Sequence, residues 1–126
     1  RLNDGRGDYP IEAPGSPLVG IKSATAVKFA DVNNDGLLDL IAVANGANQV
    51  FVRINSGGGN FTTNAPNSPL IGFNLPFNAA LADYDADGDL DLAVSNDIGG
   101  NVIVRLNNGL GDFLTPAPGS PFAVAA

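Results

Sequence analysis

The chain of 126 residues contains no cysteine, histidine, methionine or tryptophan. Without cysteine or histidine it cannot form a Ser-His-Asp triad, a thiol nucleophile or an imidazole base. It also has no disulfides from which a redox compartment could be inferred. Pairs of carboxylates would suit a glycosidase, but those present here fall within the acidic loops described below. Glu12, the sole glutamate, has no evident partner in the sequence. We therefore expect that the chain is not an enzyme.

Basic residues are scarce and scattered: there are six, against 13 acidic residues, for a net charge of −7. A nucleic-acid surface needs clustered lysine and arginine, so this class of partner is not expected. No apolar run approaches the ~20 residues of a membrane span. Eight of the acidic residues fall in two short segments, namely Asp31, Asp35, Asp39, Asp83, Asp85, Asp87, Asp89 and Asp91. The acidity is thus concentrated in two loops rather than spread over the surface.

The two acidic segments share one pattern. Residues 31–39 read DVNNDGLLD and residues 83–91 read DYDADGDLD, and both fit D-x-[DN]-x-D-G-x-x-D. Oxygen ligands at alternate positions, with glycine where the backbone turns sharply, are typical of a calcium loop. Carboxylates packed this closely repel one another unless a cation or water intervenes. The pattern predicts two Ca²⁺ sites, and the alternative is a pair of Asx-rich turns that bind no metal.

The spacing assigns the ligands. In the first loop they are Asp31, Asn33, Asp35, the backbone carbonyl of Leu37, and Asp39; in the second loop they are Asp83, Asp85, Asp87, the carbonyl of Asp89, and Asp91. The Asp89 side chain is expected to point to solvent. These loops are not EF-hands, which need a glutamate at position twelve and flanking helices. Position twelve is Ala42 in one loop and Val94 in the other, and the flanks alternate like strands.

The loops belong to an internal repeat with a period of 52 residues. RLNDGRGDY begins at Arg1, RINSGGGNF at Arg53 and RLNNGLGDF at Arg105. APGSPL at 13–18, APNSPL at 65–70 and APGSPF at 117–122 keep the same spacing. A fixed period of this length is typical of a solenoid, a propeller or an array.

Each repeat can be divided into four strands separated by short turns. The first copy gives strands near 23–32, 37–45, 48–55 and 61–70, and the second near 77–84, 90–96, 100–107 and 112–122. Prolines in the fourth strand suit an outer edge, where a missing N–H does no harm. No segment shows helical periodicity. The sequence therefore predicts an all-β fold of β-propeller blades, each with four antiparallel strands and a calcium loop between its first and second strands.

The chain resembles the FG-GAP/VCBS repeat of integrin-type β-propellers. The residues that carry the resemblance are FADVNNDGLLDL at 29–40, LADYDADGDLDL at 81–92 and NNGLGDF at 107–113. The resemblance implies calcium at one end of a propeller and an extracellular or cell-surface location. It also implies a role in adhesion, in carbohydrate recognition or as an accessory module.

The repeat divides the chain into residues 1–20, the outer strand of a preceding blade without a calcium loop, and blades at 21–72 and 73–126. A propeller closes with about four to eight blades. The chain is therefore expected to be part of a longer array or to associate with copies of itself. The leading function is an extracellular calcium-binding module that recognises a protein or glycan. The alternatives are a structural protein that assembles into a ring or filament, and an accessory domain of a secreted polysaccharide-active enzyme.

Two short motifs have simpler explanations within the repeat. Arg6-Gly7-Asp8 spells an integrin-recognition tripeptide, but the other copies place Gly58-Gly59-Asn60 and Leu110-Gly111-Asp112 in the same turn. Asn60-Phe61-Thr62 is a glycosylation sequon, yet Phe61 matches Tyr9 and Phe113, which indicates an aromatic for blade packing.

Arg53 and Arg105 recur at the end of the third strand. These arginines could pair with loop carboxylates, line a ligand groove or lie in solvent at the strand end. A structural salt bridge or a solvated strand end is the commoner outcome.

Overall fold

The structure is a computed structural model that describes residues 1–8 and 10–124. Its first sheet contains β1 (Ala24–Ala30), β2 (Asp39–Ala44), β3 (Gln49–Ile54) and β4 (Thr63–Asn64). A short 3-10 turn, η1 (Asn45–Ala47), links β2 to β3. The second sheet contains β5 (Pro76–Ala82), β6 (Asp91–Asn96), β7 (Asn101–Leu106), β8 (Thr115–Pro116) and β9 (Phe122–Ala123). No helix in the described chain is long and apolar enough to span a membrane.

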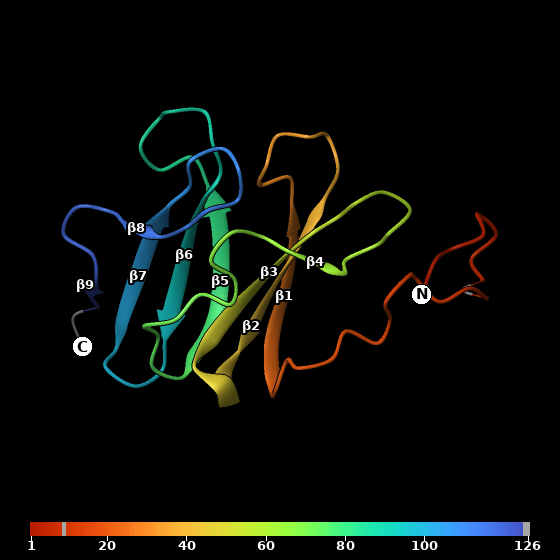
Figure 1. Ribbon diagram of the computed structural model, residues 1–126. Coiled ribbons are helices and arrows are strands. Elements are labelled where there is room, and N and C mark those ends of the chain that lie inside the picture. The colour runs from red at the N-terminus through yellow and green to blue at the C-terminus, as the bar shows by residue number, and fades with distance from the viewer. Residues whose placement is uncertain (9, 125–126) are drawn as a thin grey trace.

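Each sheet is an antiparallel meander. The strand order is β1-β2-β3-β4 in one sheet and β5-β6-β7-β8 in the other. β9 pairs with the first residues of β7, whereas β8 pairs with its last residues. The sheets lie side by side, and the β1–β2 and β5–β6 loops emerge at the same end of the molecule (Figure 1). The predicted all-β fold is confirmed: the two sheets are consistent with propeller blades. Over the described residues they do not close into a propeller.

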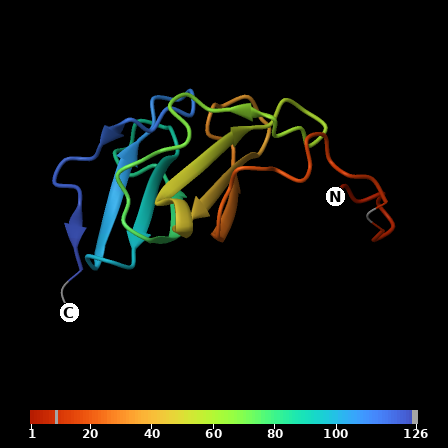
Figure 2. The same cartoon turned by 60° about the horizontal axis from the view of Figure 1, so that its bottom comes forward.

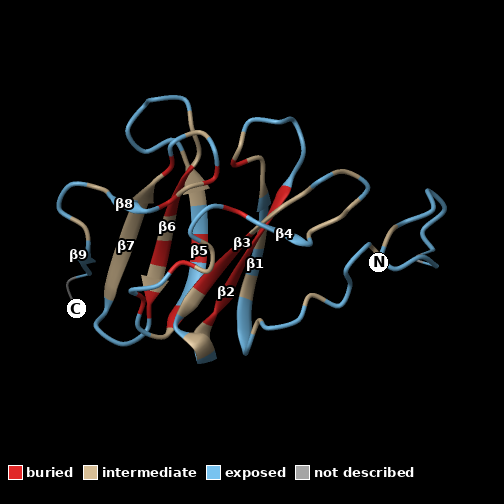
Figure 3. Cartoon of the chain, viewed as in Figure 1, coloured by how far each residue is buried: buried red, intermediate tan, exposed pale blue. Residues whose placement is uncertain are grey.

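The core lies between the two sheets. Ile41, Val43, Val50 and Val52 of the first sheet are fully buried, as are Leu92 and Val94 of the second. Every residue of β2 is buried, because the second sheet covers one of its faces and Phe51 with the chain before β1 covers part of the other (Figure 3). Alternation along each strand therefore sorts the apolar side chains onto two faces.

The outer strand of each blade is shorter than predicted. β4 has two residues where the sequence predicted a strand over 61–70, followed by an isolated bridge between Val50 and Leu70. Prolines interrupt the ladder because they lack an N–H. A serine hydroxyl replaces one missing acceptor: Ser68 Oγ accepts from the Val52 N–H at 2.9 Å, and Ser120 Oγ accepts from Val104 N–H at 3.0 Å.

The N-terminal segment runs past β1, away from the second sheet (Figure 2). Its described residues form an isolated bridge between Leu2 and Ile11, and the Arg6-Gly7-Asp8 tripeptide lies in the turn between them. Tyr9 lies outside the described residues. The assignment of residues 1–20 to the outer strand of a preceding blade stays a prediction, as do the boundaries of the blades at 21–72 and 73–126.

Candidate metal centre

The two acidic loops connect the first and second strands of their sheets, as predicted. The loop at 31–38 joins β1 to β2, and the loop at 83–90 joins β5 to β6. Gly36 and Gly88 have φ of +85° and +98°, a conformation that a side chain would strain. The glycine in the motif is therefore required by the backbone of the turn.

The same hydrogen bonds hold both loops. The first aspartate accepts the N–H groups four and five residues later: Asp31 from Asp35 and Gly36, and Asp83 from Asp87 and Gly88. Side-chain oxygens at the third and fifth positions accept further backbone N–H groups. These bonds hold the acidic side chains against the loop backbone, although most of these residues remain exposed.

The last aspartate of each loop is fully buried. The Asp91 carboxylate accepts the Tyr84 N–H at 2.9 Å through one oxygen and the Asn107 N–H at 2.8 Å through the other. Asp39 accepts in the same way from Val32 at 3.0 Å and Asn55 at 2.8 Å. Each carboxylate therefore ties its loop to the end of the third strand. A carboxylate oxygen has a second lone pair, so these bonds leave capacity for a metal.

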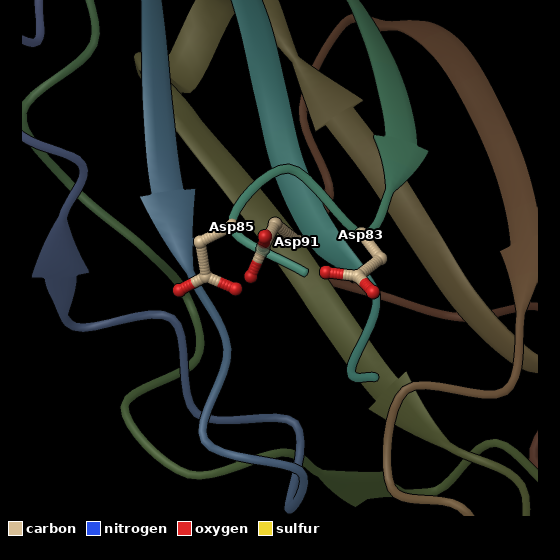
Figure 4. A group of neighbouring side chains, drawn as sticks. All are labelled: Asp83, Asp85 and Asp91. Atoms are coloured by element: carbon tan, nitrogen blue, oxygen red, sulfur yellow. The ribbon is translucent and has the colours of Figure 1, made fainter. Parts of the chain in front are cut away.

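The second loop brings three carboxylates together. One oxygen from each of Asp83, Asp85 and Asp91 lies within 4.8 Å of the others. Asp91 lies between Asp85 and Asp83, and the three side chains converge from different parts of the loop (Figure 4). Asp87 is outside this group and binds the Asp89 N–H through Oδ1 at 2.9 Å.

The first loop forms no comparable cluster of three acidic groups among the described residues. Asn33 stands where the second loop has Asp85, and its amide Nδ2 donates to Asp35 Oδ2 at 2.9 Å. An amide that can donate satisfies a neighbouring carboxylate, whereas a third carboxylate would repel it. The two loops thus have the same backbone hydrogen bonds but differ in the number of acidic side chains that they carry.

Burial and neighbouring carboxylates raise the pKa of one aspartate in each loop, Asp85 and Asp39. Desolvation, followed by the charges of Asp87, Asp91 and Asp83, raises the pKa of Asp85 above its ordinary value. The backbone N–H of Asp87, which donates to Asp85, opposes this shift. Burial raises the pKa of Asp39, and the backbone N–H groups of Asn55 and Val32 oppose this shift. A divalent cation at the cluster would relieve this repulsion.

The prediction for the Asp89 side chain is wrong. Asp89 Oδ1 accepts from Asn34 Nδ2 at 2.8 Å, so the side chain bridges the second loop to the first instead of pointing to solvent. Its carboxylate also packs against Gly109, where an added Cβ would lie 2.7 Å from Oδ2. The repeat offered no signal for this bond, because the counterpart of Asn34 in the second loop is Ala86.

A second bond between the blades was also missed. Asn107 Nδ2 donates to the Val32 carbonyl at 2.8 Å and to the Leu90 carbonyl at 3.1 Å, and the residue is buried. It therefore joins the turn after β7 to both acidic loops. Asn55, its counterpart, donates to Leu38 O at 3.1 Å within its own blade.

The recurring arginines do not reach the loop carboxylates. Arg105 donates to the carbonyls of Leu114 at 3.0 Å and Ile71 at 3.2 Å, and Arg53 donates to the Thr62 carbonyl at 3.5 Å. They hold the irregular outer segments to the third strands. Glu12 does have a partner, contrary to expectation: Arg1 lies 3.3 Å from its carboxylate.

Comparison with known families agrees with this geometry. A model of an FG-GAP-like repeat matches residues 31–94, a span that begins with the first acidic loop and includes the second. The chain belongs to the FG-GAP-like repeat family. A search of curated proteins and a search of solved structures each returned no match. Within this family, the two sheets correspond to blades, and the loops at 31–39 and 83–91 correspond to the acidic motif of the repeat.

Proposed function

We propose that the chain is a calcium-binding FG-GAP-like module in which the metal is structural. The observation that carries the proposal is the convergence of Asp83, Asp85 and Asp91 in a loop whose motif and hydrogen bonds recur 52 residues earlier. Carboxylate and carbonyl oxygens are the ligands that Ca²⁺ prefers, and Ca²⁺ tolerates irregular shells of six to eight oxygens. The donor set therefore fits this ion.

The residues proposed to hold the metal are those assigned from the spacing. Asp83, Asp85, Asp87, the carbonyl of Asp89 and Asp91 would serve the second site, and the matching positions from Asp31 to Asp39 the first. The ion supplies positive charge that offsets the repulsion among the carboxylates. Since Asp91 and Asp39 also fix the third strand through Asn107 and Asn55, metal binding should stiffen the whole blade end.

We further propose that the module is non-catalytic and works outside the cell, in adhesion or in the recognition of a protein or glycan. Loops of this type reach Kd values of about 0.1–1 mM in extracellular modules, where calcium is abundant. Their exposed position at one end of both sheets would let calcium order a recognition surface. An assay for binding to glycan and matrix-protein arrays, with calcium or with EDTA, tests this wider role.

Calorimetric titration with CaCl₂ tests the metal proposal. The wild-type chain should bind two ions, and the variant Asp83→Asn should bind one, because the second site then loses a charged ligand. Asp112→Asn, an acid outside both loops, is the matched control and should still bind two. A chain that binds no calcium at millimolar concentrations would refute the proposal.

A further inference from the structure

Each sheet buries one face against its neighbour and leaves the other face open. The first sheet packs through its Ile41 and Val52 face onto the Ala79 and Leu92 face of the second. Residues on the open face of the second sheet lie one repeat, 52 residues, after the buried residues of the first sheet. Residues on the open face of the first sheet lie one repeat before the buried residues of the second. The open face of the second sheet is formed by Ala93, Val102, Val104, Leu106, Ala117 and Phe122. The corresponding face of the first sheet carries Val27, Phe29, Leu40, Phe51 and Phe61; we call it the open face of the first sheet, although Leu40 and Phe51 in it are already buried.

The open faces carry apolar side chains at positions that the interface buries. Val27 is 51% exposed, whereas its counterpart Ala79 is 5% exposed. Phe122 is 44% exposed, whereas its counterpart Leu70 is 5% exposed. Tyr84, Leu106 and Ala117, together with the acidic residue Asp85, line a hollow of about 300 Å³ on the open face of the second sheet. Apolar patches of this kind mark interaction surfaces.

The described residues among 1–18 already occupy the outer part of the open face of the first sheet, where Leu2 and Leu18 lie near Phe29 and Phe61. They sit there as residues 53–70 sit on the second sheet: a Cβ on Gly59 would lie 3.7 Å from Ala13 Cβ, and one on Gly111 would lie 3.6 Å from Ala65 Cβ. Ala13 and Ala65 are one repeat apart. This face is therefore shaped to receive the outer segment of a blade.

Two pairs of positions match the open faces to each other. A Cβ on Gly15, which has φ of +74°, would collide with Thr62 Cγ2, so any other residue there would force Thr62 to move. Gly15, Asn67 and Gly119 occupy the same position in successive copies of the repeat. The outer segment that would dock on the first sheet of a partner copy therefore carries glycine, Gly119, at the position where Gly15 lies now.

The second match replaces a polar pair by an apolar pair. Asn34 and Asp89 hydrogen-bond across the existing interface. Their counterparts on the open faces are Ala86, on the second sheet, and Leu37, on the first. Neither open face therefore presents an unpaired carboxylate or amide at this point of the contact, which would be costly to bury.

We propose that the open face of the second sheet docks on the open face of the first sheet in a second copy of this chain. Residues 105–122 of one copy then replace residues 1–18 on the other, and Phe61 enters the hollow beside Leu106. The contact continues the arrangement of the two sheets within one chain. It joins different surfaces of the two copies, so it can repeat from head to tail. The inference does not rest on the proposed function, although Asp85 of the second acidic loop borders the hollow that receives Phe61.

Sedimentation velocity of the full chain over a range of concentrations tests the proposal. Association should increase with concentration, and a peptide of residues 1–20 added in excess should suppress it, while a scrambled peptide should not. Val104→Glu should weaken association about tenfold or more, since it places a charge at the centre of the contact. Leu110→Glu is the matched control and should associate like the wild type: Leu110 is exposed at the turn tip of the docking segment, and a Cβ on Gly58, its counterpart at the existing interface, would have no atom within 4 Å.

Gly119→Asn provides a second variant that keeps the fold, because Asn67 adopts a positive φ at the same place in the first blade. It should weaken association by colliding with Thr62 of the partner copy. A chain that remains monomeric at all concentrations overturns the proposal. So does an assembly that ignores the peptide, Val104→Glu and Gly119→Asn alike.

Discussion

At the scale of single residues, Asp91 and Asp85 belong to one carboxylate cluster but have different surroundings. Asp91 is buried and both of its oxygens accept backbone N–H groups, whereas Asp85 is exposed. A buried acceptor that is lost leaves an N–H unsatisfied, which costs about 1–3 kcal/mol. The two side chains can therefore be separated by substitution.

Asp91→Asn should lower the free energy of unfolding by about 1–3 kcal/mol even in EDTA, because an amide nitrogen cannot accept the second N–H. Asp85→Asn should leave stability in EDTA within about 0.5 kcal/mol of the wild type, since surface changes have small effects. Urea unfolding of both variants measures this difference. Equal losses would contradict the structural role of Asp91.

The second loop should bind Ca²⁺ more tightly than the first. Its side-chain ligand positions hold four aspartates, with Asp89 as a fifth in the motif, whereas those of the first loop hold three aspartates and one asparagine. Added ligand charge raises affinity. Asn33→Asp should then raise the affinity of the first site, and Asp85→Asn should lower that of the second. Calcium titrations followed by NMR of each loop measure the two sites separately. Equal affinities in the wild type would refute this prediction.

At the scale of elements, the acidic loops are joined across the blade interface. Asn34 and Asp89 should show a coupling energy of about 0.5–1.5 kcal/mol in a double-mutant cycle of alanine variants. The measurement is the free energy of unfolding of the single and double variants. The pair Asn34 and Asp112, for which the structure gives no mutual hydrogen bond, serves as control and should show additive effects. Additivity for Asn34 and Asp89 would mean that the bond does not hold the loops together.

The turn after β7 should matter more than the turn after β3. Asn107→Ala removes bonds to Val32, Leu90 and Gly111, and we expect a loss of about 2–4 kcal/mol. Asn55→Ala removes only bonds within its own blade and should cost about 1–2 kcal/mol. Thermal and urea unfolding compare the two variants. A larger loss for Asn55→Ala would contradict the assigned role of Asn107.

Much of this element-level picture follows from the sequence, because the period of 52 residues repeats both the strand alternation and the loop motif. The inner strands and the glycine turns were predicted for that reason. The outer strands were predicted too long, since a strand pattern does not reveal that Ser68 replaces a backbone acceptor. The Asn34–Asp89 bond and the Asn107–Val32 bond join different copies of the repeat. The structure gives no counterpart of either bond one period away among the described residues, so no comparison of copies could find them.

At the scale of the whole molecule, the two blades form one packed unit with its acidic loops at one end and an open apolar face on each side. Calcium should therefore stabilise the unit as a whole rather than a single loop. For a site with Kd of about 0.1–1 mM, 10 mM Ca²⁺ adds about 1.4–2.7 kcal/mol to the free energy of unfolding. Two sites in a cooperative unit should add their contributions.

The most direct test is the free energy of urea unfolding of the wild-type chain in 10 mM CaCl₂ and in EDTA. It is compared with a variant that carries Asp31→Asn and Asp83→Asn, at a concentration low enough to keep both monomeric. We predict that calcium stabilises the wild type by about 3–5 kcal/mol and the variant by much less. Equal stability of the wild type in calcium and in EDTA would contradict the claim that these loops are structural calcium sites.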